Sequence, residues 1–398
     1  MDIVIGAAFG DEGKGVMTHY LASRYGNDAI VVRFNGGAQA GHTVVTSNQQ
    51  RHVFRHIGSG TFAGAATFLS QFFVSNPILF LEEINQLHLL GLAPKVYIDP
   101  SSIITTPYDM MINQIIEEQR GHQRHGSCGV GFAETIERNL LPEYSLTVAD
   151  LDDRAKTMNT LYLIQKKWLA KRLATLGITD IPEQWREHIE SDDIFQLFVE
   201  HLALFSAQIN VTRIDLNSPS HQVIFEGAQG LMLDQDRGWF PHVTRSNTGL
   251  KNVLHLVSAN DNMALNVFYV TRCYLTRHGA GPLPHELTHL PYKQVIDHTN
   301  VTNDHQGHLR YAWFNLSLVK SFIQSDLNDV SATVPVDSYL AVTCLDQVDN
   351  QITFIDDNKV CQASQDAFLK KLREEINISK MFGNYGPTSE TIRELGKA

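Results

Sequence analysis

The sequence predicts an α/β protein with a large, mainly parallel central sheet that carries helices on its faces. Short apolar runs rich in β-branched residues, such as residues 2–5, 29–34 and 223–225, alternate with stretches whose apolar residues recur at helical spacing. Glycine-rich turns follow several of these runs. Alternation of this kind is typical of parallel strands joined by helices, and ligands bind where such strands end.

The length and composition indicate a globular protein with room for a large core. The chain has 398 residues, of which 43% are hydrophobic and 19% are charged, and its formal net charge is −11. This charge argues against broad binding to nucleic acid or to anionic membranes. The cysteines at positions 128, 273, 344 and 361 have no metal-type spacing, and no secretory leader or membrane-spanning run is apparent. We therefore expect a cytoplasmic protein with reduced thiols.

We expect a single domain over residues 1–398, with a helical insertion at residues 151–209. One helical stripe of this insertion contains Leu161, Ile164, Trp168, Leu169 and Leu173. Because no chemistry-bearing pattern occurs there, we interpret it as packed structure or a dimer surface. Pro77 is expected to begin an earlier helix, and residues 108–119 another.

The first strand, residues 2–5, runs into a glycine turn at residues 9–15 and then into a helix that starts near Gly13. Free N–H groups and the dipole at a helix start favour an anion, and Lys14 would add a positive charge to a bound phosphate. The P-loop pattern is nearly met, but Ala8 replaces its first glycine and Gly15 replaces the Ser/Thr that holds magnesium. The turn is therefore P-loop-like, and an ordinary P-loop NTPase is disfavoured.

Asp11 is the unusual residue of this turn. A carboxylate beside a phosphate is repelled unless it binds a metal or acts as a base. The alternative is an N-capping aspartate, which is common before helices.

A second glycine loop follows the strand at residues 29–34, and His42 lies within it. If the first helix is a crossover, both loops lie at the same edge of the sheet, so that Asp11 and His42 converge. A carboxylate and an imidazole at one phosphate site are a plausible base and acid for phosphoryl transfer. A lone surface histidine is the alternative.

The string Gly-Asp-Glu-Gly-Lys-Gly at residues 10–15, together with residues 36–43, resembles adenylosuccinate synthetases. These enzymes join aspartate to IMP with GTP and Mg²⁺ through a 6-phosphoryl intermediate. The resemblance implies that Asp11 removes the N1 proton and binds magnesium, that His42 stabilises the transferring phosphoryl group, and that the Gly41 carbonyl is a second metal ligand. It also implies nucleotide contacts from Gly10, Glu12, Gly13, Lys14, Gly15, Gln39 and Thr43, with Gln39 in place of the family's Asn.

A second strong match to the family spans residues 226–248 without a gap, and a third spans residues 276–284. In the first of these, Gln229 matches the amide that contacts the purine near C6, and Thr244 matches a ligand of the IMP phosphate. A glutamine suits the first position because its amide can both donate and accept at the changing oxygen.

A third glycine-rich loop occupies residues 125–131. By resemblance it holds the IMP phosphate, with Cys128 where the family has threonine, so that Ser127 and backbone N–H groups are the remaining donors. A flexible surface turn is the alternative. Arg138 lies about where the family has an arginine that crosses a dimer interface to the partner's nucleotide.

The clearest departure from the family is at residues 300–313. Relatives grip the aspartate carboxylates there with a threonine loop and several arginines, whereas this chain keeps Thr302 and one arginine, Arg310. One cation is a poor match for a dicarboxylate. The amine is therefore open: aspartate bound differently, another amino acid or amine, or none. Arg310 could equally cap or pair with a helix start near Trp313.

Near the C-terminus, Asp346 matches the aspartate that reads guanine, and Gly386 and Pro387 match the segment that closes over that base. Adenine cannot offer the same pair of donors, which favours GTP over ATP, although Cys344 replaces the lysine that flanks the base.

These observations predict a GTP- and Mg²⁺-dependent C–N ligase acting at C6 of a purine 5′-monophosphate, with aspartate as amine and a homodimeric state by family habit. A variant synthetase acting on a deoxypurine monophosphate such as dGMP or dIMP, as in a phage branch of the family, is also compatible with the sequence. Asp11 and Asp346 place the chain nearer the IMP and GTP chemistry. A purine-nucleotide-binding regulator without ligase activity and a nucleotide hydrolase are the competing classes.

Overall fold

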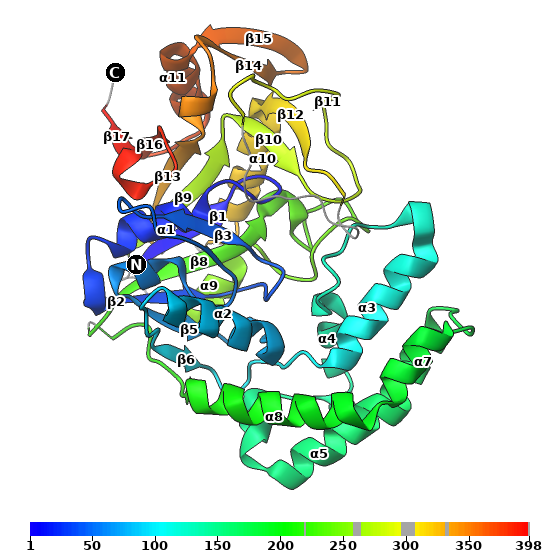
Figure 1. The fold of residues 1–398 in the computed structure, drawn as a ribbon. Helices are drawn as coiled ribbons and strands as arrows, with labels where there is room; N and C mark the ends of the chain where they lie inside the picture. The colour runs from blue at the N-terminus through cyan, green and yellow to red at the C-terminus, as the bar shows by residue number, and fades with distance from the viewer. Residues whose placement is uncertain (219, 258–263, 296–306, 331–333, 397–398) are drawn as a thin grey trace.

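A ten-stranded sheet forms the centre of the molecule in the computed structural model, which describes all residues except 219, 258–263, 296–306, 331–333 and 397–398 (Figure 1). All neighbouring strands pair in parallel except the two nearest the C-terminus, which are antiparallel. The predicted large, mainly parallel sheet is thus confirmed. In sheet order the strands are β17 (Ile392–Leu395), β16 (Lys380–Asn384), β13 (Val336–Thr343), β9 (Leu265–Arg272), β1 (Asp2–Gly6), β8 (Gln222–Gly230), β2 (Ala29–Arg33), β5 (Ala66–Leu69), β6 (Val96–Ile98) and β7 (Asn210–Val211).

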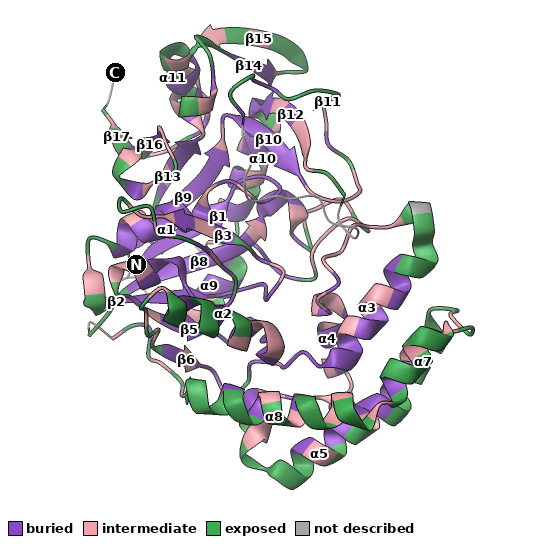
Figure 2. Cartoon of the chain, viewed as in Figure 1, coloured by how far each residue is buried: buried purple, intermediate pink, exposed green. Residues whose placement is uncertain are grey.

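Helices cover both faces of this sheet, which explains why its strands read as continuous apolar runs. In β1, Val4 packs with the helix α1 (Lys14–Ala22), whereas Ile3 and Ile5 face the opposite layer. That layer includes α9 (Leu250–Val257) and α10 (Leu316–Leu327). The central strands are accordingly almost wholly buried (Figure 2).

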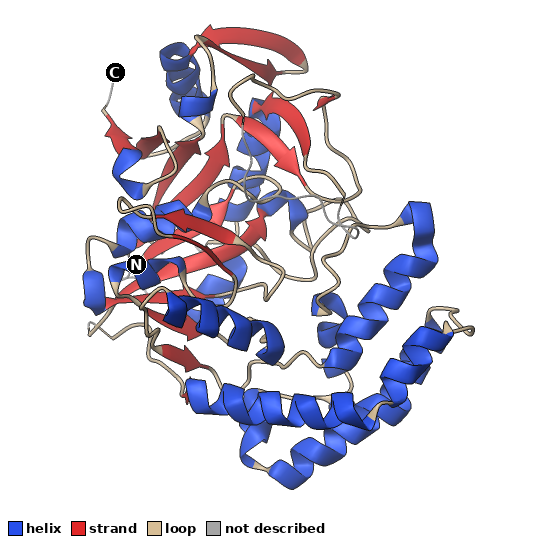
Figure 3. Cartoon of the chain, in the orientation of Figure 1, coloured by secondary structure: helices blue, strands red, loops and turns tan. Residues whose placement is uncertain are grey.

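Residues 151–209 are mainly helical (Figure 3), and their being an insertion within one domain stays a prediction. The five predicted stripe residues are all buried, in one cluster with parts of two earlier helices. These two are α2, which begins at Pro77 as predicted, and α3, which carries a capping box at Thr106. The helices of this region are α2 (Pro77–Leu89), α3 (Pro107–Arg120), α4 (Phe132–Asn139), α5 (Arg154–Leu163), α6 (Leu169–Thr175), α7 (Glu183–Glu190) and α8 (Asp192–Gln208).

Two smaller sheets complete the fold. A hairpin follows the second glycine loop, and a five-stranded sheet with the helix α11 (Gln365–Glu375) lies beyond the carboxyl end of β9 (Figure 1). Across the described ranges, no helix is both long and apolar enough to span a membrane. The strands are β3 (His42–Val45) and β4 (Arg51–Phe54) in the hairpin, and β10 (Tyr274–Arg277), β11 (Glu286–Leu287), β12 (Arg310–Asn315), β14 (Gln351–Asp356) and β15 (Lys359–Ser364) in the sheet.

The carboxyl ends of the parallel strands meet at one edge of the central sheet, and the candidate loops follow them there. The turn after β1 contains Asp11, the loop after β2 leads to His42, and β8 ends beside Gln229. The turn after β13 contains Asp346.

Candidate active site

The turn after β1 is organised around the buried carboxylate of Glu12. One carboxylate oxygen accepts hydrogen bonds from the backbone N–H groups of Ala8 and Gly10, each at 2.9 Å. The other lies 3.0 Å from the Lys14 ammonium, and both side chains are only 3% exposed. Glu12 therefore supports the loop from inside and fixes the Lys14 ammonium beside it.

Gly13, and not Asp11, is the N-cap residue of α1. Its φ of 92° is left-handed, a conformation that glycine adopts without strain, and no side chain caps this helix. The N-capping interpretation of Asp11 is thus wrong, because the helix starts two residues too late for it.

Asp11 itself has a left-handed φ of 58°, and its carboxylate lies 2.9 Å from Nε2 of His278. Burial alone would raise its pKa, but the hydrogen bond and charge of His278, with the charges of Arg272 and Lys14, lower the pKa of Asp11 to about 2. Asp11 is therefore an anion in the neutral range, able to accept a proton or to hold a cation.

His42 is held by a buried carboxylate that the sequence did not single out. Its Nδ1 lies 2.7 Å from Glu226, which is fully buried in the middle of β8. Glu226 also accepts hydrogen bonds from the backbone N–H and the hydroxyl of Ser59, and a guanidinium nitrogen of Arg33 lies 3.8 Å away. These contacts lower the pKa of Glu226 to about 2. Burial lowers the pKa of His42, and the charge of Glu226 opposes that effect.

The two glycine loops touch because residue 15 has no side chain. A Cβ atom on Gly15 would lie 3.0 Å from the Cβ of His42 and 3.1 Å from the carbonyl oxygen of Thr43. A larger residue would push the His42 loop away from the first turn of α1. On the other side of the turn, Gln229, with φ 65°, lies against Gly10. The structure thus brings the Asp11 turn together with His42 on one side and Gln229 on the other.

The side-chain amide of Gln39 is buried, and neither its nitrogen nor its oxygen has a hydrogen-bond partner in the described part of the chain. Nearby, Asn35 exchanges two hydrogen bonds with the backbone of Ala228, at 3.0 and 2.7 Å, and so ties this loop to β8. A buried amide without partners is costly, so a ligand group that pairs with Gln39 would be favoured there.

The loop at residues 125–131 is fastened to α3. Glu117 accepts hydrogen bonds from the backbone N–H groups of Gly126 and Ser127, and the Ser127 hydroxyl donates to Asn113 at 2.9 Å. The donors expected to hold a phosphate are thus engaged within the protein. Burial raises the pKa of the Cys128 thiol to about 11, and Asp11 is among the charges that act on it.

Arg138 does not have the predicted role. Its side chain is fully buried, and it forms a double contact with Asp109 at the start of α3. Nη1 donates to the carbonyl group of Tyr144, and Nη2 donates to that of Ile104 as well as to Asp109. The prediction that Arg138 crosses to a partner's nucleotide is therefore wrong, because a guanidinium used in this way cannot leave the core.

Arg310 is likewise engaged within the protein. It forms a double contact with Glu286 and donates to the carbonyl groups of Gly279 and Gly281, each at 2.9 Å. The alternative of a structural pairing is therefore what the structure shows. Thr302 lies outside the described residues. Thr244 is half-buried, and its backbone N–H donates to Leu233.

Asp346 is an exposed residue in the turn Leu345–Gln347 after β13. Partial burial of its carboxyl group raises its pKa. Gly386 and Pro387 follow the neighbouring strand β16, and Thr388 pairs with Val45 of the hairpin. The two candidate base-contacting segments thus lie at adjacent strand ends.

Arg272 links the turn at residues 345–347 to the turn that contains Asp11. It donates to the backbone carbonyl of Asp11 and, at 3.1 Å, to the Tyr274 hydroxyl, which in turn donates to Gln347 at 2.6 Å. Like Glu226 and His278, Arg272 was not predicted as a site residue. Its only signal in the sequence is a charge at the end of an apolar strand.

No cluster of three or more His, Cys, Asp or Glu side chains suited to a metal occurs within the described ranges. A magnesium ion bound mainly by substrate phosphates and water needs only one or two protein oxygens. The Asp11 carboxylate and the exposed Gly41 carbonyl are hard oxygen donors of the kind this ion prefers.

Residues 3–365 match the family model described as adenylosuccinate synthetase. An adenylosuccinate synthetase of Clostridium botulinum (strain Alaska E43 / Type E3) is 31% identical over 337 residues, covering 80% of this chain and 73% of that relative.

Two solved structures share the fold. One is a fully ligated adenylosuccinate synthetase from Plasmodium falciparum, with a TM-score of 0.75 and 18% identity over 99% of both chains. The other is the cyanophage S-2L succinoaminodeoxyadenylate synthetase bound to dGMP and dATP, with a TM-score of 0.62 and 14% identity over 100% of this chain and 95% of that one.

Proposed function

Because this chain belongs to the adenylosuccinate synthetase family, whose members are ligases that form a C–N bond, we propose that it joins L-aspartate to C6 of IMP with GTP and Mg²⁺. The observation that carries this proposal is the pairing of an anionic Asp11 with a His42 oriented by Glu226, both at the strand edge beside Gln229. A base and an acid so placed suit phosphoryl transfer to a purine oxygen.

In the first step Asp11 takes the proton from N1 of the purine, and the negative charge shifts to O6. O6 then attacks the γ-phosphorus of GTP, the bond to the β-phosphate oxygen breaks, and GDP leaves. With Nδ1 on Glu226, His42 directs Nε2 at the site. Because burial lowers the pKa of His42, the imidazolium that donates to the phosphoryl oxygens depends on the opposing charge of Glu226. Gln229 contacts the purine near C6 through its amide.

In the second step the aspartate amine attacks C6 and forms the C–N bond, the C6–O6 bond breaks, and the leaving phosphate takes the proton that the amine nitrogen loses. Lys14 and the start of α1 stabilise the negative charge of the transferring group, and Glu12 fixes the Lys14 ammonium for that task. Gln39, whose buried amide has no partner in the described part of the chain, contacts the nucleotide.

Asp11 and the carbonyl of Gly41 would hold the magnesium ion. When bound, the ion neutralises charge on the phosphates. At the other end of GTP, Asp346 accepts from the guanine N1–H and 2-amino groups, and residues 386–387 lie over the base. Gly10, Gly13, Gly15 and Thr43 surround the phosphates, while Ser127, Cys128 and Thr244 are proposed to lie near the purine monophosphate.

A second candidate function, with another amine donor, has support from the loop expected to bind aspartate. Arg310 is committed to Glu286, so no arginine of the described part of that loop is available to grip two carboxylates. A different amino acid or amine would suit this altered site. A deoxypurine monophosphate such as dGMP or dIMP in place of IMP is a further candidate, because a synthetase of the same fold is bound to dGMP. We further propose that the protein is a cytoplasmic homodimer that binds neither nucleic acid nor membranes.

The test is mass spectrometry of the purified protein incubated with IMP, GTP and MgCl₂, with and without aspartate. Adenylosuccinate is expected only when aspartate is present. Phosphate release without aspartate would point to another acceptor, and parallel reactions with dGMP or dIMP would identify a deoxy substrate. Bound nucleotide without any turnover would contradict the proposal.

A further inference from the structure

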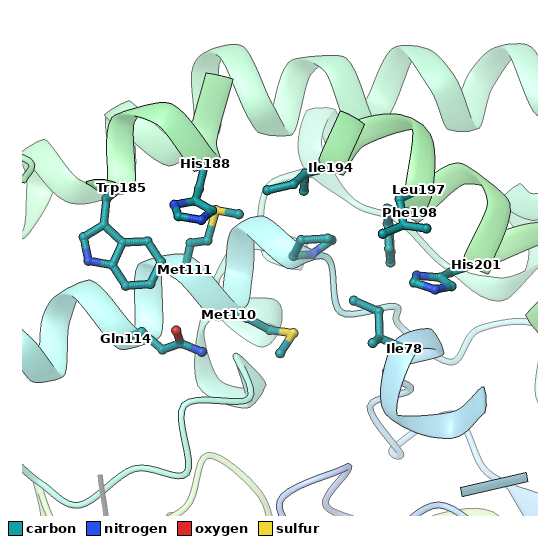
Figure 4. Close-up of a pocket in the computed structure, with 11 residues that line it drawn as sticks. Ile78, Met110, Met111, Gln114, Trp185, His188, Ile194, Leu197, Phe198 and His201 are labelled. Atoms are coloured by element: carbon teal, nitrogen blue, oxygen red, sulfur yellow. The ribbon is translucent and has the colours of Figure 1, made fainter. Parts of the chain in front are cut away.

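A pocket of about 380 Å³ opens between α3, α7 and α8, away from the edge of the sheet that carries Asp11 (Figures 1 and 4). Met110, Met111 and Gln114 of α3 form one wall. Trp185 of α7 and Leu197 and His201 of α8 lie opposite. None of the mechanistic steps proposed for the ligase uses any of these side chains. The volume lies within the range of small-molecule sites.

The lining restricts the chemistry of an occupant. Most lining side chains are apolar, and methionine sulfurs and a tryptophan favour contact with aromatic rings. The indole N–H of Trp185 already donates to Glu118, at 2.8 Å. Residues 180–200 contain seven carboxylates and one arginine, which would repel an anion such as a nucleotide phosphate. The lining itself has no carboxylate to attract a cation, so a small, uncharged aromatic molecule fits best.

One polar group in the lining is available to such a molecule. The Nδ1 atom of His201 is buried and has no hydrogen-bond partner within the described ranges. A polar group on the aromatic ligand can pair with it, which would fix the orientation of the ligand in the pocket.

The same wall of the pocket supports the loop at residues 125–131. The Gln114 side-chain amide donates to the carbonyl of Gly129 at 3.0 Å. Its neighbour Asn113 accepts from the Ser127 hydroxyl and from the backbone of Gly131. A molecule packed on Met110, Met111 and Gln114 would therefore restrain the helix that holds this loop.

We propose that this pocket is a binding site for a small, uncharged aromatic molecule, and that its occupation orders residues 125–131 through Gln114. The binding part is tested with N-phenyl-1-naphthylamine, a neutral aromatic probe whose fluorescence rises in apolar surroundings. Saturable binding to the full-length protein is expected. Leu197→Trp, which fills the pocket, should weaken it at least tenfold.

Leu204→Trp is the matched control, because Leu204 lies two turns further along α8, is 57% exposed compared with 51% for Leu197, and is not part of the lining. It should leave binding unchanged. Ile194→Trp is a second filling variant if Leu197→Trp unfolds. The proposal would be overturned if the control lost as much probe affinity as the filling variants, or if neither filling variant lost affinity. It would also be overturned if probe binding fell as the protein concentration rose, as when a second copy covers the pocket.

The ordering part is tested by hydrogen exchange of the peptide that contains residues 125–131. The probe should slow its exchange at least threefold in the wild-type protein. In Gln114→Ala the probe should still bind, but the slowing should disappear. Exchange that the probe leaves unchanged in the wild type would refute the link to the loop. This readout needs no purine nucleotide, so it stands or falls independently of the ligase reaction.

Discussion

Glu226 illustrates how one buried carboxylate can fix a catalytic side chain. It contacts the His42 imidazole, Ser59 and Arg33 together, so the ring of His42 has one orientation and a counter-charge beside it. Such outer partners orient catalytic groups without touching the substrate. Glu226 is therefore a positioning residue.

We expect Glu226→Gln to lower kcat by about 100-fold, because the imidazolium of His42 would lose its counter-charge, while KM for both nucleotides changes little. Steady-state kinetics measure this split. Ser59→Ala, which removes one hydrogen bond and no charge, is the control and should cost far less. A Glu226→Gln enzyme with wild-type kcat would show that His42 does not depend on this carboxylate.

At Asp11 the predicted effect is larger. Asp11→Ala should reduce turnover by at least about 1,000-fold and spare nucleotide binding, because it removes the base but not the backbone groups of the loop. Kinetics and calorimetric titration with IMP would separate the two quantities. Near-normal turnover of Asp11→Ala would refute the proposed role of Asp11.

Asp346→Ala should have the opposite effect: it should raise KM for GTP and change kcat less.

At the scale of elements, helices are tied to the loops of the site by buried charges. Glu83 of α2 accepts hydrogen bonds from the backbone of residues 55–57 and lies near His52 and His56. Burial alone would raise its pKa, but the proximity of these histidines and the hydrogen bonds from the backbone lower the pKa of Glu83 from 4.5 to about 2. The charged form of Glu83 therefore stabilises the fold.

This shift predicts a specific pH dependence. Because the folded-state pKa of Glu83 lies below the unfolded value, its contribution to the free energy of unfolding is complete above about pH 4.5 and is lost as the pH falls toward 2. Glu83→Gln should cost about 3 kcal/mol at pH 7, and the difference from wild type should shrink between pH 4.5 and 2 in urea unfolding. Glu82→Gln, at the exposed neighbouring position, should show no such trend. A difference that is constant with pH would contradict this account.

Arg138 connects α4 to the start of α3 through Asp109. We expect Arg138→Ala to lower the free energy of unfolding by about 3–5 kcal/mol, because it leaves the buried Asp109 carboxylate without its cation. The affinity for purine nucleotides should remain unchanged. Arg245→Ala, which breaks an exposed pair with Glu137 of the same helix, should cost about 1 kcal/mol or less. Weaker nucleotide binding by a stable Arg138→Ala protein would restore the interface interpretation.

Several helices and strands and the two glycine loops follow from local patterns, and these were predictable from the sequence. The start of α2 at Pro77 and the buried stripe of the insertion are examples. The partners of charged side chains were not predictable, because His42 meets Glu226 across 184 positions and Arg310 meets Glu286 across 24 positions. From the sequence alone, an isolated arginine can therefore equally be a ligand-binding residue or a structural one.

At the scale of the whole molecule, several large apolar side chains remain exposed, among them Leu140 at 62% and Leu89 at 89%. Exposed apolar side chains that are scattered singly are normal on a protein surface, so the proposed homodimer rests on the family resemblance. Sedimentation velocity should give the mass of two chains at micromolar concentration and a shift toward one chain on dilution. A single-chain particle at all concentrations that retains full ligase activity would contradict this prediction.

The position of β1 has a consequence for how the protein is made. Its two neighbours in the sheet are β8 and β9, so Asp2 pairs with Ile224 and Asn266. β1 is synthesised before both of its neighbours, so this apolar strand has two unpaired edges until β8 and β9 have followed it. During translation the nascent chain therefore exposes an apolar strand that other chains could pair with, and the Asp11 turn that follows β1 acquires its shape only after β8 and β9 have been made.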